Sequence, residues 1–265
     1  MTRKGGESSN AVGGHAPALP LTGERTLPGV LSENYWFRRH EAAYEFVFGL
    51  LPDEPSTGVL AEVGAGEGYG ADLLAERART VLALDYDELA IVHLARTYPR
   101  LRPVRANLAA LPIADGTVDA VVSLQVIEHV WDHPEFVAEC WRVLCPGGLL
   151  LLSTPNRLTF SPGLDTPVNP FHTHEFTAAE LSSLIARAGF EAISVLGLHA
   201  GSRLRSLDAE HAASGGFAAA QLACPPDQWP ADVRTSVASV STADFEVAEE
   251  AVDESLDLIL LARRP

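Results

Sequence analysis

Residues 59–68 have the sequence VLAEVGAGEG, a short β-prone run that ends in three glycines and leads into a predicted helix. Glycines between a strand and a helix let the backbone approach a ligand closely, because they carry no side chain. In an open α/β sheet, ligands bind beyond the carboxyl ends of the strands. This stretch therefore predicts both the fold class and the position of a ligand site.

The chain continues as an alternation of strands and helices. Strands are predicted at 59–63, 81–85, 102–106, 118–124, 149–154, 190–198 and 256–262, with helices at 69–77, 88–98, 134–144 and 177–188. Such alternation indicates parallel crossover units. We therefore expect an α/β, Rossmann-like fold with a mostly parallel seven-stranded sheet and helices on both faces. The strand at 256–262 is expected to close this sheet at an edge.

Composition and periodicity divide the chain into five regions. Residues 1–18 are rich in Gly, Ser and Pro and are expected to be a disordered lead-in. Residues 19–57 should form an N-terminal helical cap with a helix at 34–50, and residues 58–198 the cofactor-binding core. Residues 199–253 are too long for a structureless loop, so they are expected to contain helices and to act as a lid or as a substrate or dimer insertion. Residues 254–265 hold the closing strand.

The charge balance disfavours some classes of partner. Nineteen Lys and Arg against 35 Asp and Glu give a net charge of −16, which repels nucleic acid and anionic lipid. Seven acids at 244–257 are expected to form a solvated face. No apolar run approaches the roughly 20 residues of a membrane span, and no secretory signal is evident. We expect a cytoplasmic protein, monomeric or homodimeric, that binds neither nucleic acid nor membrane.

Two positions indicate which cofactor the glycine turn holds. A dinucleotide fingerprint that begins at Gly64 requires a third glycine at position 69, which is Tyr69. A carboxylate at Glu62 disfavours a pyrophosphate and favours a cofactor with an ammonium and a sulfonium. Asp85, at the end of the second strand, is placed to accept hydrogen bonds from both ribose hydroxyls.

The next residues suit an adenine ring. Tyr86 is expected against the adenine face, Asn107 at its edge, and Leu108 to supply a backbone N–H. The alternatives are that Asn107 only caps a helix and that Asp85 is an ordinary surface acid.

Several segments resemble the successive motifs of class I S-adenosylmethionine-dependent methyltransferases: ExGxGxG at 62–68, LDYD at 84–87, ANLAALPIADGTVDAVVS at 106–123 and RVLCPGGLLLLSTPN at 142–156. The likeness covers residues 58–198 and implies S-adenosylmethionine as methyl donor and S-adenosylhomocysteine as product. It also implies a set of cofactor contacts, to which we add Gly68, the third glycine of the turn. The set is Glu62, Gly64, Gly66, Gly68, Asp85, Tyr86, Asn107, Leu108 and Gln125.

A narrower resemblance extends over nearly the whole chain. LTGERTLPG at 21–29, ENYWFRRH at 33–40, QVIEHVWDH at 125–133 and NPFHTHEFT at 169–177 resemble an actinobacterial, mycobacterial-type subgroup associated with methylated glucans such as methylglucose lipopolysaccharide. This implies a sugar hydroxyl of an intracellular glucan or oligosaccharide as acceptor.

The helix predicted at 34–50 supplies further candidates for the cofactor site. Tyr35, Trp36 and Arg38, with Arg39, are expected to cover the cofactor, and an arginine could pair with its carboxylate. The alternative is a core-packing stripe with a solvated basic face. Trp131 and Phe171 could stack on sugar rings, and four polar residues in the insertion could bind the acceptor: Arg203, Arg205, Asp208 and His211.

A sugar hydroxyl is a weak acid, so its methylation requires a base or a metal. Glu128 and His129 follow the fourth strand, and His172 and His174 follow the fifth, so all four are expected at one rim. His129 or His172 would accept the proton while Glu128 orients it. The same four are candidate ligands for a divalent metal such as Mg²⁺, although Gln125 stands where metal-dependent relatives have a first glutamate. Structural roles are the third possibility.

Two other functions remain open. One is a phenol or quinone-precursor O-methyltransferase that acts on a small molecule. The other is a non-catalytic cofactor-binding subunit, which a bare acceptor rim would indicate.

Overall fold

The strands form one eight-stranded sheet in the computed structural model, which describes residues 19, 25–52 and 57–265. The lead-in predicted at 1–18 lies outside the described residues. The strand order is β3-β2-β1-β4-β5-β8-β6-β7, with β3 to β5 parallel and β8, β6 and β7 each antiparallel to the strand before it in that order. The strands are β1 (Thr57–Val63), β2 (Ala78–Asp85), β3 (Leu101–Arg105), β4 (Val118–Leu124), β5 (Leu144–Pro155), β6 (Glu191–Ala200), β7 (Phe245–Ala248) and β8 (Asp257–Arg263).

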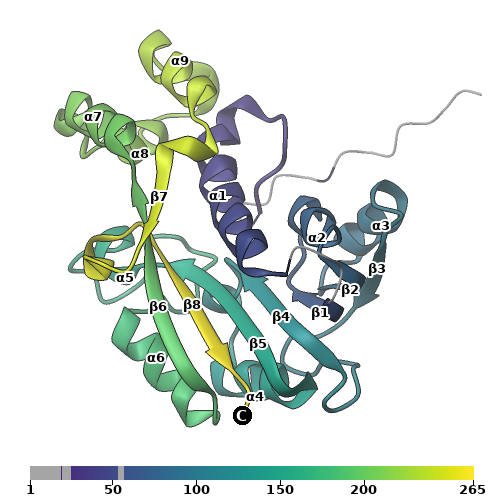
Figure 1. Cartoon of the computed structure of the whole chain (residues 1–265). Helices are drawn as coiled ribbons and strands as arrows, with labels where there is room; N and C mark the ends of the chain where they lie inside the picture. The colour runs from purple at the N-terminus through teal and green to yellow at the C-terminus, as the bar shows by residue number, and fades with distance from the viewer. Residues whose placement is uncertain (1–18, 20–24, 53–56) are drawn as a thin grey trace, which may run out of the picture.

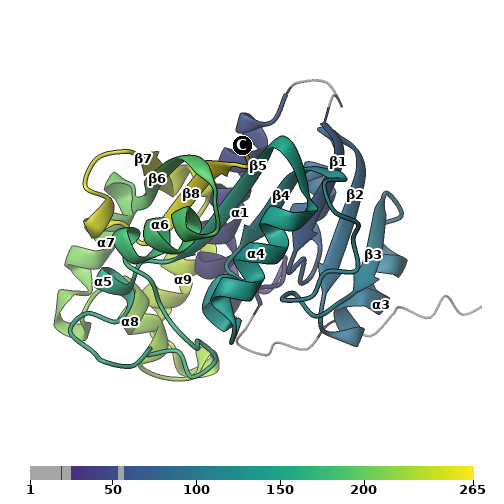
Figure 2. The same ribbon diagram turned by 90° about the horizontal axis from the view of Figure 1, so that it is seen from below.

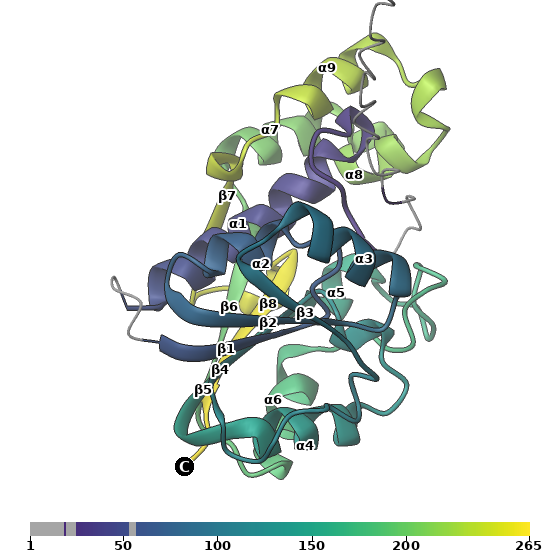
Figure 3. The same cartoon turned by 90° about the vertical axis from the view of Figure 1, so that its right-hand side faces the viewer.

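Helices cover both faces of this sheet (Figure 3). On one face lie α1 (Asn34–Leu50), α2 (Tyr69–Leu74) and α3 (Glu88–Thr97), and on the other lie α4 (His133–Val143) and α6 (Ala178–Arg187), which Figure 2 shows in front of the strands. The start of α6 has the capping box that the sequence predicts, because Thr177 and Glu180 bond each other's backbone N–H groups. The α/β fold with a mostly parallel sheet is confirmed.

Alternate residues of the central strands feed two separate cores. In β5, Leu151 packs toward α1, whereas Leu150 and Leu152 pack toward α4 and α6. In β8, Ile259 and Leu260 divide in the same way. Strands that are buried on both faces are continuously apolar, which is why these segments were recognisable in the sequence.

Two details of the predicted sheet are wrong. The structure has eight strands instead of seven, because the short β7 pairs with β6 and forms the edge. The strand predicted at 256–262 is not an edge strand, since β8 lies between β5 and β6. Hydrophobicity alone does not distinguish an inserted antiparallel strand from an edge strand.

The insertion after β6 contains the expected helices, which gather beyond α1 (Figure 1). They are α7 (Ser202–Glu210), α8 (Phe217–Leu222) and α9 (Ala231–Ser239). The side-chain amide of Asn34 donates to the carbonyls of Val237 and Val240, 2.9 Å away in each case, and joins α1 to the end of α9. The helices in the described part of the chain include none that is long and apolar enough to cross a bilayer.

Two of the four polar residues expected to bind the acceptor, Arg203 and Asp208, have partners within the insertion itself. Arg203 pairs with Asp244 at 2.7 Å, and Asp208 accepts the backbone N–H of Phe217 at 2.8 Å. Asp244 is buried, as is Asp257, so the solvated face predicted at 244–257 is wrong for these two acids.

A buried ion pair joins α1 to β8. The Arg39 guanidinium donates from Nε and Nη2 to the two carboxylate oxygens of Asp257, 2.6 Å away in each case, and from Nη2 to the Leu256 carbonyl at 2.7 Å. The rings of Trp36 and Phe160 lie 5.6 and 5.9 Å from its central carbon. The two charges of this pair thus neutralise each other inside the protein through two parallel hydrogen bonds.

Replacing Asp257 by Asn should leave the buried Arg39 charge without a counter-ion. We expect the free energy of unfolding, measured in urea, to fall by about 3–5 kcal/mol. The matched control is Arg38→Ala, which removes the neighbouring, partly exposed pair with Glu41 and should cost less than about 1 kcal/mol. Equal losses in the two variants would contradict a stabilising role for the buried pair.

Candidate active site

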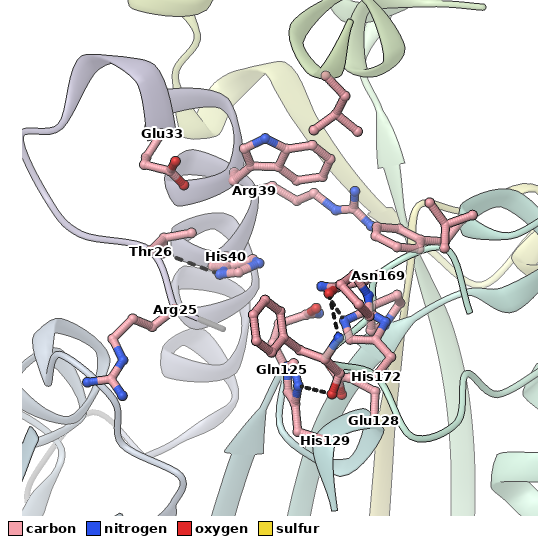
Figure 4. A pocket seen from close by; sticks show the side chains of 17 residues that line it. Arg25, Thr26, Glu33, Arg39, His40, Gln125, Glu128, His129, Asn169 and His172 are labelled. Carbon is pink, nitrogen blue, oxygen red and sulfur yellow. Dashed lines mark hydrogen bonds between the residues drawn. The ribbon is translucent and has the colours of Figure 1, made fainter. Parts of the chain in front are cut away.

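A pocket of about 450 Å³ opens at the carboxyl ends of β4 and β5 (Figure 4). Its lining combines residues from the N-terminal segment and α1 with residues of the loops that follow the two strands. The polar side chains that line it are Arg25, Thr26, Glu33, Arg39, His40, Gln125, Glu128, His129, Asn169 and His172. The apolar ones are Trp36, Pro155, Phe160, Val168, Pro170, Phe171 and Leu222.

Backbone strain marks the point where β4 enters the pocket. Gln125 has a φ of +58°, which is uncommon for a residue with a side chain and is concentrated at functional sites. Its N–H donates to the Ser153 carbonyl at 2.9 Å, which holds the turn against β5. The short helix η2 (Ile127–His129) follows directly and presents Glu128 and His129 to the pocket.

The loop after β5 is fastened to η2 by hydrogen bonds. Thr173 donates its N–H to the Glu128 carbonyl at 2.6 Å, and its hydroxyl to the Val130 carbonyl at 2.6 Å. The ring nitrogen Nδ1 of His129 lies 3.1 Å from the Phe171 carbonyl oxygen. These contacts bring His172 beside His129, with the ring centroids 4.9 Å apart.

The Phe171 carbonyl determines the tautomer of His129. A carbonyl oxygen can only accept, so Nδ1 carries the proton and Nε2 keeps its lone pair. Burial lowers the pKa of His129 to about 4, which keeps the ring neutral near pH 7. His129 therefore has a ring nitrogen able to accept a proton.

Both ring nitrogens of His172 are occupied. The side-chain oxygen of Asn169 accepts the Phe171 N–H at 3.0 Å, so its amide nitrogen faces Nε2 of His172, also at 3.0 Å, and donates to it. Nδ1 of His172 then carries the ring proton and donates to Glu175 at 2.8 Å. Burial lowers the pKa of His172. His172 is thus held in place by its neighbours and has no free lone pair.

Glu128 lies at the buried end of the pocket. Its carboxyl accepts the Thr154 hydroxyl at 3.0 Å, and burial raises its pKa to about 8. The neutral acid therefore predominates near pH 7. The orienting acid of His172 is Glu175, which sequence reasoning missed because only the fold shows that the two side chains meet.

Glu128, His129, His172 and His174 were named as candidate ligands for a metal, beside the alternatives of a histidine base and structural roles. One ligand atom from each of the first three lies within 4.8 Å of the others. His172, however, offers no free nitrogen, because both of its ring nitrogens are hydrogen-bonded to Asn169 and Glu175, so in this arrangement it is not available to a divalent cation. The prediction is wrong for His174, whose ring packs on Phe176 with the centroids 4.6 Å apart, outside the pocket.

The three glycines of the turn have different roles. Gly64 has a φ of +94°, and a Cβ there would lie 2.4 Å from Val126, so its place requires glycine for packing. Gly68 is enclosed in the same way by Leu94. Gly66 has a φ of +56° with open space beside it, so a ligand can approach the backbone at this glycine.

The residues predicted to bind the adenosine half of the cofactor lie outside the pocket, after the carboxyl ends of β2 and β3. Asp85 accepts the Gly66 N–H and the Asp87 N–H on separate oxygens, 2.8 Å away in each case, which fixes its carboxylate beside the turn. Tyr86 is largely exposed. Asn107 accepts the Ala109 N–H at 3.0 Å and so caps its own turn, whereas Leu108 is partly buried.

Glu62 is fully buried beneath α1 and does not line the pocket. One of its carboxyl oxygens accepts the Tyr44 hydroxyl, and the other has no hydrogen-bond partner. Burial raises its pKa to about 8, against the hydrogen bond from Tyr44, which lowers it.

Of the α1 residues Tyr35, Trp36 and Arg38, which were predicted to contact the cofactor, only one lines the pocket. Trp36 lines the pocket, but Tyr35 is buried against Trp36 and Phe217, and Arg38 pairs with Glu41. Neither Tyr35 nor Arg38 lines the pocket.

Several residues that line the pocket were missing from the predicted site, among them Arg25 and His40. Arg25 donates from Nη2 to Asp87 at 2.6 Å, whereas its buried Nη1 has no partner. Its place within LTGERTLPG was the available signal, but the side chain that faces the pocket could not be chosen without the fold.

Comparisons with known proteins agree with this architecture. A family model described as a methyltransferase domain matches residues 61–152. A probable S-adenosylmethionine-dependent methyltransferase of Mycolicibacterium smegmatis is 51% identical over 263 residues, which cover 98% of this chain and 100% of that protein. A ubiquinone biosynthesis O-methyltransferase of Dinoroseobacter shibae is 28% identical over 60% of this chain and 70% of that protein. The crystal structure of an S-adenosylmethionine-dependent methyltransferase of Thermotoga maritima has the same fold, with a TM-score of 0.60, 18% identity and coverage of 89% and 96% of the two chains.

The raised pKa of Glu62 makes stability depend on pH. Above about pH 4.5 the unfolded chain ionises at this position while the folded protein does not, so stability falls until about pH 8, where the folded carboxyl also ionises. Glu62→Gln has no carboxyl at this position, so it does not lose this stability. The difference in the free energy of unfolding, variant minus wild type, should therefore increase by a few kcal/mol from pH 5 to pH 8. Urea unfolding at both pH values measures the difference.

The control for this comparison is Glu76→Gln on an exposed position, which should keep the wild-type pH dependence. If Glu62→Gln also keeps it, the buried carboxyl does not titrate as described.

Proposed function

Because the chain belongs to the S-adenosylmethionine-dependent methyltransferases, we propose that it methylates a sugar hydroxyl of a glucan or oligosaccharide of the methylglucose lipopolysaccharide type. S-adenosylmethionine is its methyl donor, and S-adenosylhomocysteine is the product. The observation that carries the proposal is the free Nε2 of His129 in the pocket. The sugar acceptor is supported by the resemblance of the segments at 21–29, 33–40, 125–133 and 169–177 to the glucan-associated subgroup.

The donor supplies a methyl group on a positively charged sulfur, which is a good leaving group. The acceptor oxygen forms a bond to this methyl as the carbon–sulfur bond breaks, so the protein must align the two and remove one proton. His129 accepts that proton at Nε2 and then shares its charge with the Phe171 carbonyl through Nδ1–H. Glu128, as a neutral acid, can donate a hydrogen bond that orients the acceptor.

The donor is proposed to lie along the glycine turn and to end in the pocket. Asp85 would accept from the ribose hydroxyls and Tyr86, Asn107 and Leu108 would border the adenine, as the family resemblance implies. At the other end, the partnerless Nη1 of Arg25 supports its assignment to the methionine carboxylate, in place of Arg38.

The remaining predicted contacts fall into two groups. Trp36 and Gln125 would border the sulfonium, because both line the pocket. Glu62 keeps one oxygen without a partner, which supports its assignment to the ammonium group. The ammonium would then favour ionisation of this carboxyl.

A phenolic acceptor is the second candidate. The aromatic rings of Trp36, Phe160 and Phe171 line the pocket, a composition that suits a planar phenol. The partial similarity to a ubiquinone biosynthesis O-methyltransferase points in the same direction. A non-catalytic subunit is disfavoured, because the rim is not bare: Glu128, His129 and His172 lie together there, with one ligand atom of each within 4.8 Å of the others.

Substitution of His129 tests the proposal. His129→Ala and His129→Gln should lower kcat for glucoside methylation about 10²- to 10⁴-fold, with the dissociation constant of S-adenosylmethionine by calorimetry changed less than about twofold. His174→Ala should retain the wild-type kcat, because its ring lies outside the pocket. In the wild type, kcat/KM should rise with pH only through about 4 and then stay level, since His129 must be neutral.

Three results would contradict this account. Unchanged turnover in both His129 variants would remove the base. A rise of kcat/KM through about pH 8 would assign that role to Glu128. Loss of turnover in EDTA, restored by Mg²⁺, would show that the reaction requires a metal. Methylation of catechols with no methylation of glucosides would favour the second candidate.

A further inference from the structure

Large apolar side chains border the pocket while remaining exposed to solvent. Val168, Phe171 and Leu222 line it, with 53%, 46% and 69% of their surfaces accessible. Leu164, in the same loop as Val168 and Phe171, and Leu158, on the short helix α5 (Arg157–Phe160) before it, are also exposed, although neither lines the pocket. Clustered exposed apolar side chains at the mouth of a pocket mark a binding surface.

The loop at 161–171 holds these side chains outward by its own hydrogen bonds. The Ser161 hydroxyl accepts the Val168 N–H at 3.0 Å, and Asn169 accepts the Phe171 N–H at 3.0 Å. Prolines at 162, 167 and 170 restrict the backbone further, and Asp165 is its one charged residue. The apolar side chains are thus presented by a pre-organised loop instead of being packed into a core.

Leu222, from the insertion, lines the same pocket as this loop. Its helix α8 is anchored through Phe217, which is fully buried, so Leu222 cannot readily turn inward. Valine and leucine side chains offer no hydrogen bonds to sugar hydroxyls and bind alkyl groups by excluding water.

We propose that the acceptor is an amphiphile, whose hydroxyl-bearing head group enters the polar end of the pocket and whose alkyl chain lies over Val168, Phe171 and Leu222. This rests on the proposed function, since the head group is placed at His129. The head group meets Glu128 and His129 at the buried end, and the chain leaves through the apolar mouth. We assign these apolar side chains to the acceptor molecule and not to a protein partner, because they line the same pocket as Glu128 and His129.

A series of n-alkyl glucosides tests the proposal with the full chain. Methyl, butyl, hexyl and octyl β-D-glucoside are compared below their micelle concentrations, with binding measured by calorimetry and kcat/KM by methyl transfer. Affinity should rise about two- to fourfold with each added methylene that is buried. Val168→Ser and Leu222→Ser should flatten this rise, because each removes apolar surface on which the alkyl chain would lie.

Matched controls are Val92→Ser and Leu89→Ser, which alter exposed residues of the same types on α3 and should keep the wild-type rise. Equal affinities along the series, or the same slope in all four variants, would overturn the proposal. So would a dimer that dissociates in Leu222→Ser, because a second copy would then cover the mouth. Chain-length-dependent binding without any methyl transfer would support the amphiphile while contradicting the proposed sugar methylation, so the two can fail separately.

Discussion

The hydrogen bonds between residues 171–174 and η2 are the contacts on which the pocket depends. β4 and β5 are neighbours in the sheet, but the loops that follow them are free to diverge. Thr173 prevents this by bonding the carbonyls of Glu128 and Val130, and the Phe171 carbonyl takes the Nδ1 proton of His129. The same few contacts therefore close one wall of the pocket and determine which histidine nitrogen can accept a proton.

Burial then decides the charge of the site. The pKa of Glu128 is raised to about 8 and that of His129 is lowered to about 4, so both groups are neutral near pH 7. In the proposed reaction a sulfonium loses its positive charge as His129 gains one. The net charge of the pocket is unchanged by this exchange, which limits the cost of carrying out the reaction away from bulk water.

Local patterns predicted the elements well, because each depends on nearby residues. The helix at 34–50, the strand at 118–124 and the Thr177 capping box agree with the structure residue by residue. The position of β8 inside the sheet, the burial of Tyr35 and the pairing of Arg39 with Asp257 could not be predicted, because each is decided by contacts between distant segments. Glu175 lies only three residues after His172, but their contact depends on the conformation of the loop. The sequence also could not show on which side of the loop His174 lies. Although it is only two residues from His172, its ring packs on Phe176 outside the pocket.

The most direct test of the account is the tautomer of His129, measured by long-range ¹H–¹⁵N correlation NMR and assigned with His129→Gln. The account predicts a neutral ring at pH 7 with the proton on Nδ1, an unprotonated Nε2, and charging only as the pH approaches about 4. A proton on Nε2, or a charged ring at pH 7, would contradict it, because His129 would then have no lone pair to accept the proton of the acceptor hydroxyl.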